Sequence, residues 1–222
     1  MELKLGINKT VKLIPWKSKT KKDFIKVFKK KGEKATEEDM ISVLMTPYIE
    51  PNDVFYSSDE IQYILGTLRQ ISIEDVIKFS IDCDNKECGE EFPVETTVED
   101  LMYYKESEYP KTLDNIIWRD LPKSNSLSNL IKKYPEEPPK DLEVLIHIEA
   151  INDEVITSFD HLLKLTEELT LSEGAKIDED FKKVKSSLEI KTKTICPHCN
   201  LEKEYIFDII PTYFDPLLPK DM

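Results

Sequence analysis

The chain has 222 residues, of which 40% are hydrophobic and 34% are charged, and its formal net charge is −13. This length allows one domain, or two small ones, with a sizeable core. No run of 18 apolar residues occurs, and the N-terminal MELKLGINKT lacks the apolar region of a secretory signal, so we expect neither a membrane span nor secretion. Four cysteines without a signal predict a reducing compartment, where clustered cysteines more often bind metal or do redox chemistry than form disulfides.

The charge is distributed unevenly along the chain. Residues 1–34 contain 12 Lys against Glu2, Asp23 and Glu33, a balance of 12 − 3 = +9, so the remainder carries −13 − 9 = −22. A basic stretch can be a nucleic-acid footprint. KKDFIKVFKKKG, however, places apolar residues at helical spacing among its lysines, which favours an amphipathic helix with a solvated lysine face. The acidic remainder repels nucleic acid and suits a protein that docks on basic protein surfaces or only needs to stay soluble.

The N-terminal segment predicts a β-hairpin followed by helices. LKLGINKTVKLIP alternates apolar and polar residues on both sides of GIN, and Pro15 and Trp16 close this hairpin. The lysine-rich helix follows and is expected to stop near Gly32.

Two capping boxes predict the starts of the next two helices. Thr36 is followed three residues later by Asp39, and Ser57 is followed by Glu60. Apolar residues recur on one side of each segment that follows, as expected for helices packed on a core.

The hydrophobic period changes to two before each pair of cysteines. VIKFSIDC predicts a strand that runs into Cys83, and EEFPVET after Cys88 predicts a returning strand. The second pair repeats this order, because LEIKTKTI leads into Cys196 and EKEYIFDII leads away from Cys199. Each pair of cysteines therefore lies in the turn of a predicted hairpin.

The segment between the two hairpins is predicted to be mainly helical. EEPPKDLEVLIHIEAI has a proline-rich start and a mixed apolar run, Ser158 has the position of a helix N-cap, and IDEDFKKVKSSL predicts a further helix. Residues 103–140 are rich in Pro, Ser, Asn and charge, which predicts a long connection.

These elements predict an α+β fold. We expect an N-terminal hairpin and helical region over residues 1–75. Two distant hairpins, residues 76–97 and 187–211, are expected to form a zinc-ribbon-like module, and residues 98–186 a mainly helical insertion between them.

The spacing of the cysteines predicts one structural zinc ion with four ligands: Cys83, Cys88, Cys196 and Cys199. Structural zinc sites are tetrahedral and often built from thiolates, and two ligands from one turn are commonly separated by two to four residues. Four residues separate the first pair and two separate the second. A shell closed by four cysteines leaves no position for water, so we expect no catalytic role for the metal.

The residues that follow each second cysteine support this prediction. The backbone there must turn so that N–H groups point at the sulfurs, which requires a left-handed conformation. Gly89 is the best residue for that conformation and Asn200 is the next best.

Three alternatives for the cysteines fit the sequence less well. A redox Cys-x-x-Cys needs only one pair and usually opens a helix, whereas both pairs lie between predicted strands. A disulfide is disfavoured by the expected compartment. His198 lies inside CPHC and could replace one cysteine as a ligand, although its neighbours Cys196 and Cys199 are better placed.

Motifs typical of catalysis are absent from the sequence. The chain has only five glycines, with no dinucleotide-binding or phosphate-binding glycine loop and no G-x-S-x-G. His147 and His161 each stand alone, so core packing or surface placement is the simpler interpretation. Asp and Glu are too dispersed to single out a catalytic pair, so the sequence favours a protein that is not an enzyme.

The order of these motifs resembles that of a phage family. A short hairpin leads into KLIPWKSKTKKDF, and YSSDEIQYILGTLRQISIEDVIKFSIDC runs into the first cysteine turn. A helical insertion follows, then the late CPHC hairpin and the tail IPTYFDPLLP. Over nearly its whole length the chain resembles the baseplate hub assembly family of contractile-tailed, T-even-type bacteriophages.

The resemblance implies a protein made in the host bacterial cytoplasm during infection. It would help to build the hub of the tail baseplate, either as an assembly factor or as a minor part of the virion tail baseplate. Its implied partners are phage tail hub or tape-measure proteins, which would dock on the helices beside a rigid, zinc-bound platform.

A nucleic-acid-binding zinc ribbon, such as a transcription factor, is the alternative function. A ribbon of that kind is expected to carry Lys, Arg and aromatic residues on its own hairpins. Residues 82–100 instead contain one lysine against eight carboxylates: Asp82, Asp84, Glu87, Glu90, Glu91, Glu95, Glu99 and Asp100. This composition favours a protein partner over nucleic acid.

Overall fold

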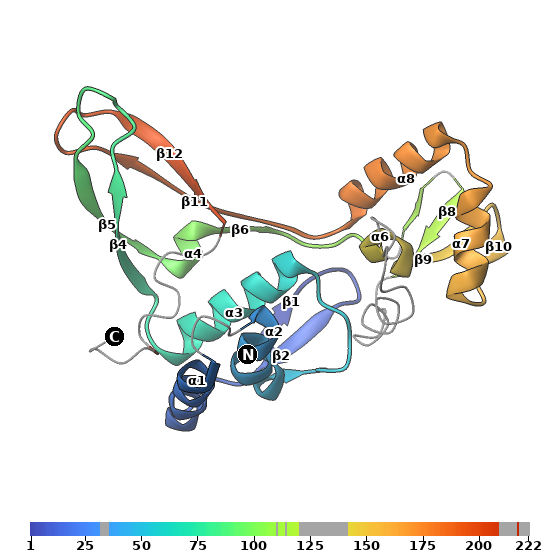
Figure 1. Ribbon diagram of the computed structural model, residues 1–222, viewed down its shortest axis with the longest axis horizontal. Helices are drawn as coiled ribbons and strands as arrows, with labels where there is room; N and C mark the ends of the chain where they lie inside the picture. The colour runs from blue at the N-terminus through green and yellow to red at the C-terminus, as the bar shows by residue number, and fades with distance from the viewer. Residues whose placement is uncertain (32–35, 110, 114, 120–141, 209–216, 218–222) are drawn as a thin grey trace.

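The chain folds into two lobes that a long antiparallel pair of strands connects (Figure 1). The computed structural model describes residues 1–31, 36–109, 111–113, 115–119, 142–208 and 217. The main lobe contains the N-terminal helices and two long hairpins, and the insertion lobe lies between Lys105 and Ser187. Helices and several small sheets are both present, which confirms the predicted α+β class. No helix in these described ranges is long and apolar enough to cross a bilayer.

In the residues that the structure describes, the main lobe combines a small antiparallel sheet, in the order β1-β2-β3, with four helices and one 3-10 turn. The strands are β1 (Glu2–Lys4), β2 (Thr10–Leu13) and β3 (Ile49–Glu50). The helical elements are α1 (Ser18–Lys31), α2 (Glu37–Leu44), η2 (Thr46–Tyr48), α3 (Ser58–Ser72) and α4 (Val98–Leu101). The predicted N-terminal hairpin and lysine-rich helix are therefore confirmed, and Gly32 lies just outside the described residues.

Both predicted capping boxes are present at the starts of α2 and α3. The Thr36 hydroxyl accepts from the N–H of Asp39 at 3.3 Å, and the Asp39 carboxylate accepts from the N–H of Thr36 at 3.0 Å. Ser57 and Glu60 make the same exchange at 3.3 and 2.9 Å. Each box satisfies two backbone groups at the first turn, which fixes where the helix begins.

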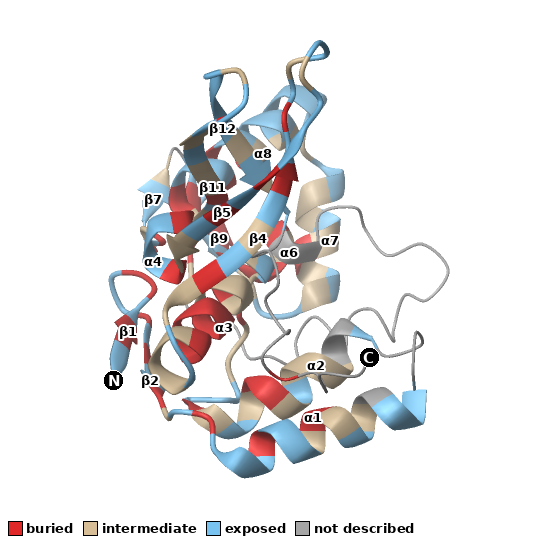
Figure 2. Ribbon diagram, turned by 90° about the vertical axis from the view of Figure 1, so that its left-hand side faces the viewer, coloured by how far each residue is buried: buried red, intermediate tan, exposed pale blue. Residues whose placement is uncertain are grey.

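Helix α3 lies at the centre of the main core (Figure 2). Its buried residues Ile64 and Leu68 pack with Leu5 and Val11 of the N-terminal hairpin, and all four are fully buried. Trp16 joins the hairpin to α2, because its indole N–H donates to the carbonyl oxygen of Leu44 at 2.6 Å. This core fixes the base from which the long hairpins project.

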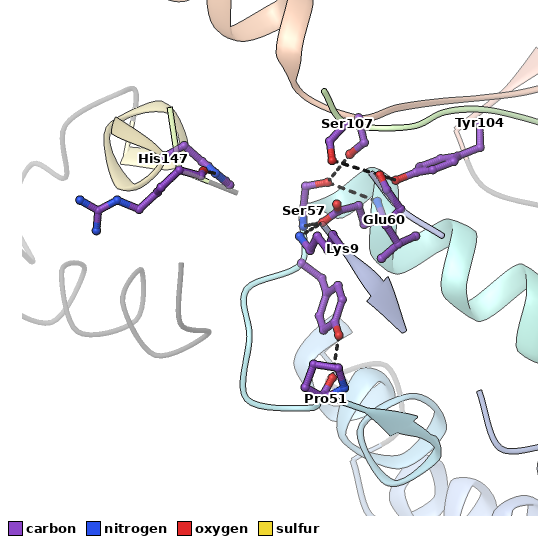
Figure 3. Close-up of polar contacts among 11 residues, drawn as sticks. Lys9, Pro51, Ser57, Glu60, Tyr104, Ser107 and His147 are labelled. Carbon is purple, nitrogen blue, oxygen red and sulfur yellow. Dashed lines mark hydrogen bonds and ion pairs between the residues drawn. The ribbon is translucent and has the colours of Figure 1, made fainter. Parts of the chain in front are cut away.

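A buried ion pair links the hairpin loop to α3 (Figure 3). Lys9 Nζ lies 2.6 Å from Glu60 Oε2, and their side chains are only 4% and 3% exposed. The Lys9 ammonium also lies 5.0 Å from the centre of the Tyr56 ring. The Tyr56 hydroxyl donates to the Pro51 carbonyl oxygen at 2.6 Å, so the pair anchors several segments at once.

Two long hairpins extend from the main lobe and face each other (Figure 1). The first consists of β4 (Val76–Asp82) and β5 (Glu91–Thr97). The second consists of β11 (Ser187–Ile195) and β12 (Glu202–Phe207). The other edge of β11 pairs with β6 (Met102–Lys105), so the second sheet has the order β12-β11-β6.

The insertion lobe has its own core and its own sheet. Its helices, α6 (Leu142–Ile146), α7 (Phe159–Glu167) and α8 (Leu171–Val184), agree with the predicted helical insertion. Its sheet has the order β10-β9-β8-β7, formed by β7 (Thr112–Leu113), β8 (Ile116–Trp118), β9 (Ile148–Ile151) and β10 (Glu154–Val155). Trp118 and Val184 are fully buried in this core.

The sheet of the insertion lobe corrects one expectation. Residues 103–140 were expected to form a long connection, but their described part contains β6, β7 and β8, while residues 120–140 lie outside the description. The two strands of the lobe in this stretch have two and three residues, which is too short for an alternating pattern to emerge from the sequence.

Candidate metal centre

The four cysteines lie at the tips of the two long hairpins. β4 leads into Cys83, where the N–H donates to the Glu90 carbonyl oxygen at 3.0 Å. The second tip repeats this contact, because the N–H of Cys196 donates to the Leu201 carbonyl oxygen at 2.9 Å. Both predicted hairpins are therefore confirmed, and in each one the turn begins at the first cysteine of the pair.

The residue after each second cysteine has the expected left-handed conformation. The φ angle is 59° at Gly89 and 58° at Asn200. Glycine adopts this region without steric cost, and asparagine tolerates it better than most residues. The N–H of Gly89 donates to the Asn85 carbonyl oxygen, and the N–H of Asn200 donates to the Cys196 carbonyl oxygen, both at 2.9 Å.

The tips bring all four sulfurs together. Each cysteine of one hairpin approaches a cysteine of the other: Cys83 Sγ lies 3.5 Å from Cys199 Sγ, and Cys88 Sγ lies 3.9 Å from Cys196 Sγ. All four sulfurs lie within 4.8 Å of one another, and none is in a disulfide.

These distances fit a tetrahedral shell of thiolates. A zinc–sulfur bond of about 2.3 Å with tetrahedral angles separates neighbouring sulfurs by about 3.8 Å. The two contacts across the hairpins lie on either side of this value. Two of the ligands, Cys83 and Cys196, are buried and the other two are half-buried, so the cluster is shielded on one side.

Backbone N–H groups point at the sulfurs, and the neighbouring thiols raise the pKa of Cys83 but lower that of Cys199. The N–H of Leu201 lowers the pKa of the Cys199 thiol to about 7, although burial acts in the other direction. The N–H of Asn85 favours ionisation of Cys83 in the same way, but burial and the neighbouring thiols together raise its pKa to about 12. Four thiolates this close repel one another, and a divalent cation at their centre would remove that repulsion.

A small apolar cluster and one ion pair hold the hairpins face to face. Phe92 and Val94 of β5 are buried with Ile81 beside the cysteines. Behind them the rings of Phe79 and Phe207 meet edge to face, with centroids 5.4 Å apart. At the tip, Lys203 of the second hairpin forms an ion pair with Asp84 of the first.

Sequence reasoning did not find the Asp84–Lys203 ion pair. The sequence shows an acidic residue in one turn and a lysine near the other, but only the face-to-face arrangement of the two hairpins brings them into contact. The three histidines lie outside the sulfur cluster. His147 is a core residue with 3% exposure, and burial lowers the pKa of its imidazole to about 4. His161 is half-buried, 2.9 Å from Glu154, and His198 is exposed.

Comparison with protein families identifies the chain at the family level. A family model described as T4 bacteriophage base plate protein matches residues 1–215. The chain belongs to this family. The match includes both hairpins, all four cysteines and the insertion lobe, and it confirms the resemblance to T-even-type baseplate proteins. Neither the curated proteins nor the solved structures gave a significant match.

Proposed function

We propose that this baseplate protein acts in tail morphogenesis without enzymatic activity. In this role it assembles the baseplate hub, or forms part of it, through protein–protein contacts. It works in the host bacterial cytoplasm during assembly, and its partners are tail hub or tape-measure proteins. Family membership over residues 1–215 supports the baseplate role.

We further propose that the four cysteines bind one structural Zn²⁺. The observation that carries this proposal is the approach of four sulfurs from two hairpins to within 4.8 Å of one another. Zinc suits the set because thiolates are its preferred ligands in structural sites and because four of them complete a tetrahedron. The ion would clamp the hairpins of residues 76–97 and 187–211 into one rigid, zinc-ribbon-like platform.

Metal analysis tests the zinc proposal directly. Protein purified from cells without chelator should contain about one zinc per chain by mass spectrometry of the metal. The same preparation should show no free thiol reaction until a strong chelator is added. Protein that carries no metal, or that has a disulfide within either pair, would contradict the proposal.

The first hairpin argues against the nucleic-acid alternative. Asp82, Glu90 and Glu91 are exposed around the first cysteine turn, where a nucleic-acid ribbon would present cations to phosphates. We therefore expect no binding to random duplex or single-stranded DNA at physiological salt.

Co-expression tests the partner proposal. The chain should form a stable complex with a tail hub or tape-measure protein of the same phage, and the complex should survive size-exclusion chromatography at physiological salt. Mass spectrometry of purified virions then separates an assembly factor, which is absent from them, from a structural part. Micromolar DNA binding together with failure to capture any of these tail proteins would replace the proposal with the nucleic-acid alternative.

A further inference from the structure

The outer side of α1 carries a stripe of lysines. Five exposed lysines lie within an arc of about 100° on one side of the helix: Lys19, Lys22, Lys26, Lys29 and Lys30. This side points away from the buried Thr20 and Phe24, and it is exposed in Figure 2. The stripe is about 15 Å long between Lys19 and Lys29. Among the residues that the structure describes, its only acidic partner is Asp23, which lies 3.3 Å from Lys26.

The tip of the β4–β5 hairpin has the opposite charge. Four of its exposed carboxylates have no ion-pair partner in the described part of the chain: Asp82, Glu87, Glu90 and Glu91. Asp82 and Glu91 also lie directly opposite each other in the antiparallel ladder. Like charges in this arrangement destabilise a ladder, so an approaching cation would relieve repulsion that the hairpin already contains.

The stripe and the tip of one molecule do not meet. Helix α1 lies at one end of the main lobe and the hairpin tips lie at the other, in both Figure 1 and Figure 2. Their charges nevertheless match in size. The five lysines of the stripe and the adjacent Asp23 have a balance of +4, and residues 82–91 at the tip contain five carboxylates and one Lys, a balance of −4.

We propose that the lysine stripe of α1 binds the acidic β4–β5 tip of a second copy of this chain. The two surfaces of this contact differ. In a pair of copies, the copy that uses its stripe keeps a free tip, and the copy that uses its tip keeps a free stripe, so a further copy can bind at either end. Such a head-to-tail contact closes into a ring or continues as a chain of subunits. This inference goes beyond the proposed function, because the partner is the protein itself.

Single exposed ion pairs contribute little, so the contact needs several of them and should weaken with salt. Sedimentation velocity of the full-length, metal-containing protein measures the extent of self-association over a series of protein and salt concentrations. We expect species larger than the monomer at low salt and a return to monomer as the salt concentration rises.

Charge reversal identifies the two surfaces. The variant Lys22→Glu/Lys26→Glu/Lys29→Glu changes the stripe, and the variant Glu90→Lys/Glu91→Lys changes the tip. Each should weaken self-association about tenfold or more, because several ion pairs become repulsive. A 1:1 mixture of the two variants should associate again, because each reversed surface then meets an oppositely charged one.

A matched control reverses two exposed lysines on a different helix. Lys176→Glu/Lys182→Glu on α8 lowers the net charge by 4, compared with 6 for the stripe variant, but should leave self-association as it is. Metal content and far-UV circular dichroism of every variant check that the fold is intact.

Three outcomes would overturn the proposal. The wild-type protein could stay monomeric at every concentration and salt, or the mixture of the two variants could fail to associate. The wild-type protein could also bind duplex DNA without self-associating, and lose this binding in the lysine variant. That result would assign the stripe to nucleic-acid binding instead. A failure of self-association alone leaves the proposed hub partners and the zinc site unaffected, whereas DNA binding would also contradict the expectation that the protein does not bind DNA.

Discussion

Gly6 lies where the N-terminal hairpin touches the segment that enters the insertion lobe. It forms an isolated bridge with Ser107, and the Ser107 N–H and hydroxyl both donate to the Leu5 carbonyl oxygen. A Cβ atom at Gly6 would lie 2.0 Å from Ser107 Oγ and 2.7 Å from the Ser107 carbonyl oxygen. The backbone of one segment would have to move, so this close approach requires glycine.

Gly6→Ala should therefore destabilise the protein by about 1–3 kcal/mol, the usual cost of forcing extra atoms into a packed site. Chemical denaturation at constant metal content measures the change. Gly174→Ala is the matched control, because nothing lies within 4 Å of a Cβ there and the residue is the fourth of α8. Alanine is the better helix former, so that variant should gain up to about 1 kcal/mol. Equal effects of the two substitutions would rule out the steric explanation.

The buried pair of Lys9 and Glu60 (Figure 3) predicts that replacing one partner destabilises the protein far more than replacing both. Glu60→Gln retains an oxygen for the capping box at Ser57 but removes the carboxylate charge that lies 2.6 Å from the buried Lys9 ammonium. The expected loss of unfolding free energy is about 3–5 kcal/mol. The double variant Lys9→Met/Glu60→Gln should recover most of this loss, since no uncompensated charge is then buried.

The exposed pair of Lys12 and Glu50 serves as the control for this prediction. Its atoms are 2.9 Å apart, but both side chains are more than half exposed. Glu50→Gln should change the unfolding free energy by less than about 1 kcal/mol. A Glu60→Gln variant as stable as Glu50→Gln would show that water reaches Lys9.

Among the elements, the two hairpins should depend on the metal far more than the helices do. The hairpins share only a small cluster around Ile81 and Phe92, whereas the helices belong to the larger cores of the two lobes. Cys196→Ser, or treatment with a strong chelator, should lower the melting temperature and leave much of the helical circular dichroism at 222 nm. Structural zinc contributes on the order of 10 kcal/mol in small peptides, but here the helical cores limit the loss to part of the structure.

His198→Ala is the control for the metal ligands. His198 lies between Cys196 and Cys199 in sequence but is exposed and outside the sulfur cluster. This variant should keep the metal content and melting temperature of the wild type. If it loses metal while Cys196→Ser keeps it, the histidine replaces that cysteine as a ligand.

Features that depend on near neighbours in the chain could be predicted from the sequence. The capping boxes at Thr36 and Ser57 link residues three apart, and the left-handed turns at Gly89 and Asn200 follow from residue type and cysteine spacing. The clustering of the four cysteines was predicted in the same way, because paired thiols at a turn have few other uses in a reducing compartment.

Features that depend on distant residues could not be predicted. A lysine in a loop is expected at the surface, and only the fold brings Lys9 to Glu60. The pairing of β6 with β11 joins segments on either side of the whole insertion. Strands β7 and β10 have two residues each, and their stability comes from the sheet and core around them, so their own sequence carries no usable pattern.

At the scale of the whole molecule, the two lobes should fold independently. Lys105 and Ser187 lie directly opposite each other in the β6–β11 ladder, so a two-residue Asn-Gly turn can join them in place of residues 106–186. The core of the main lobe contains no described residue from the removed segment. The shortened chain should fold, bind one zinc, and lose the contacts that the removed segment makes with the main lobe, among them Ser107 with Leu5, Ser186 with Ser57, Glu106 with Lys4 and His147 with Phe55.

Circular dichroism melting and metal analysis of the shortened chain check this prediction. The full-length protein at the same concentration is the reference. A shortened chain that is unfolded or metal-free would show that the two lobes form one cooperative unit.

The β6–β11 ladder also determines when the sulfurs can meet during folding. Cys88 and Cys196 are 108 residues apart in the chain. Once Met102 pairs with Ile190, only 102 − 88 = 14 residues on one side and 196 − 190 = 6 on the other separate them. Each halving of a loop saves about 0.6 kcal/mol of closure entropy, so the ladder saves roughly 1.5 kcal/mol. We therefore expect a metal bound by the four sulfurs to join the protein late, so that its retention would be a sign that synthesis and folding of the chain have reached completion.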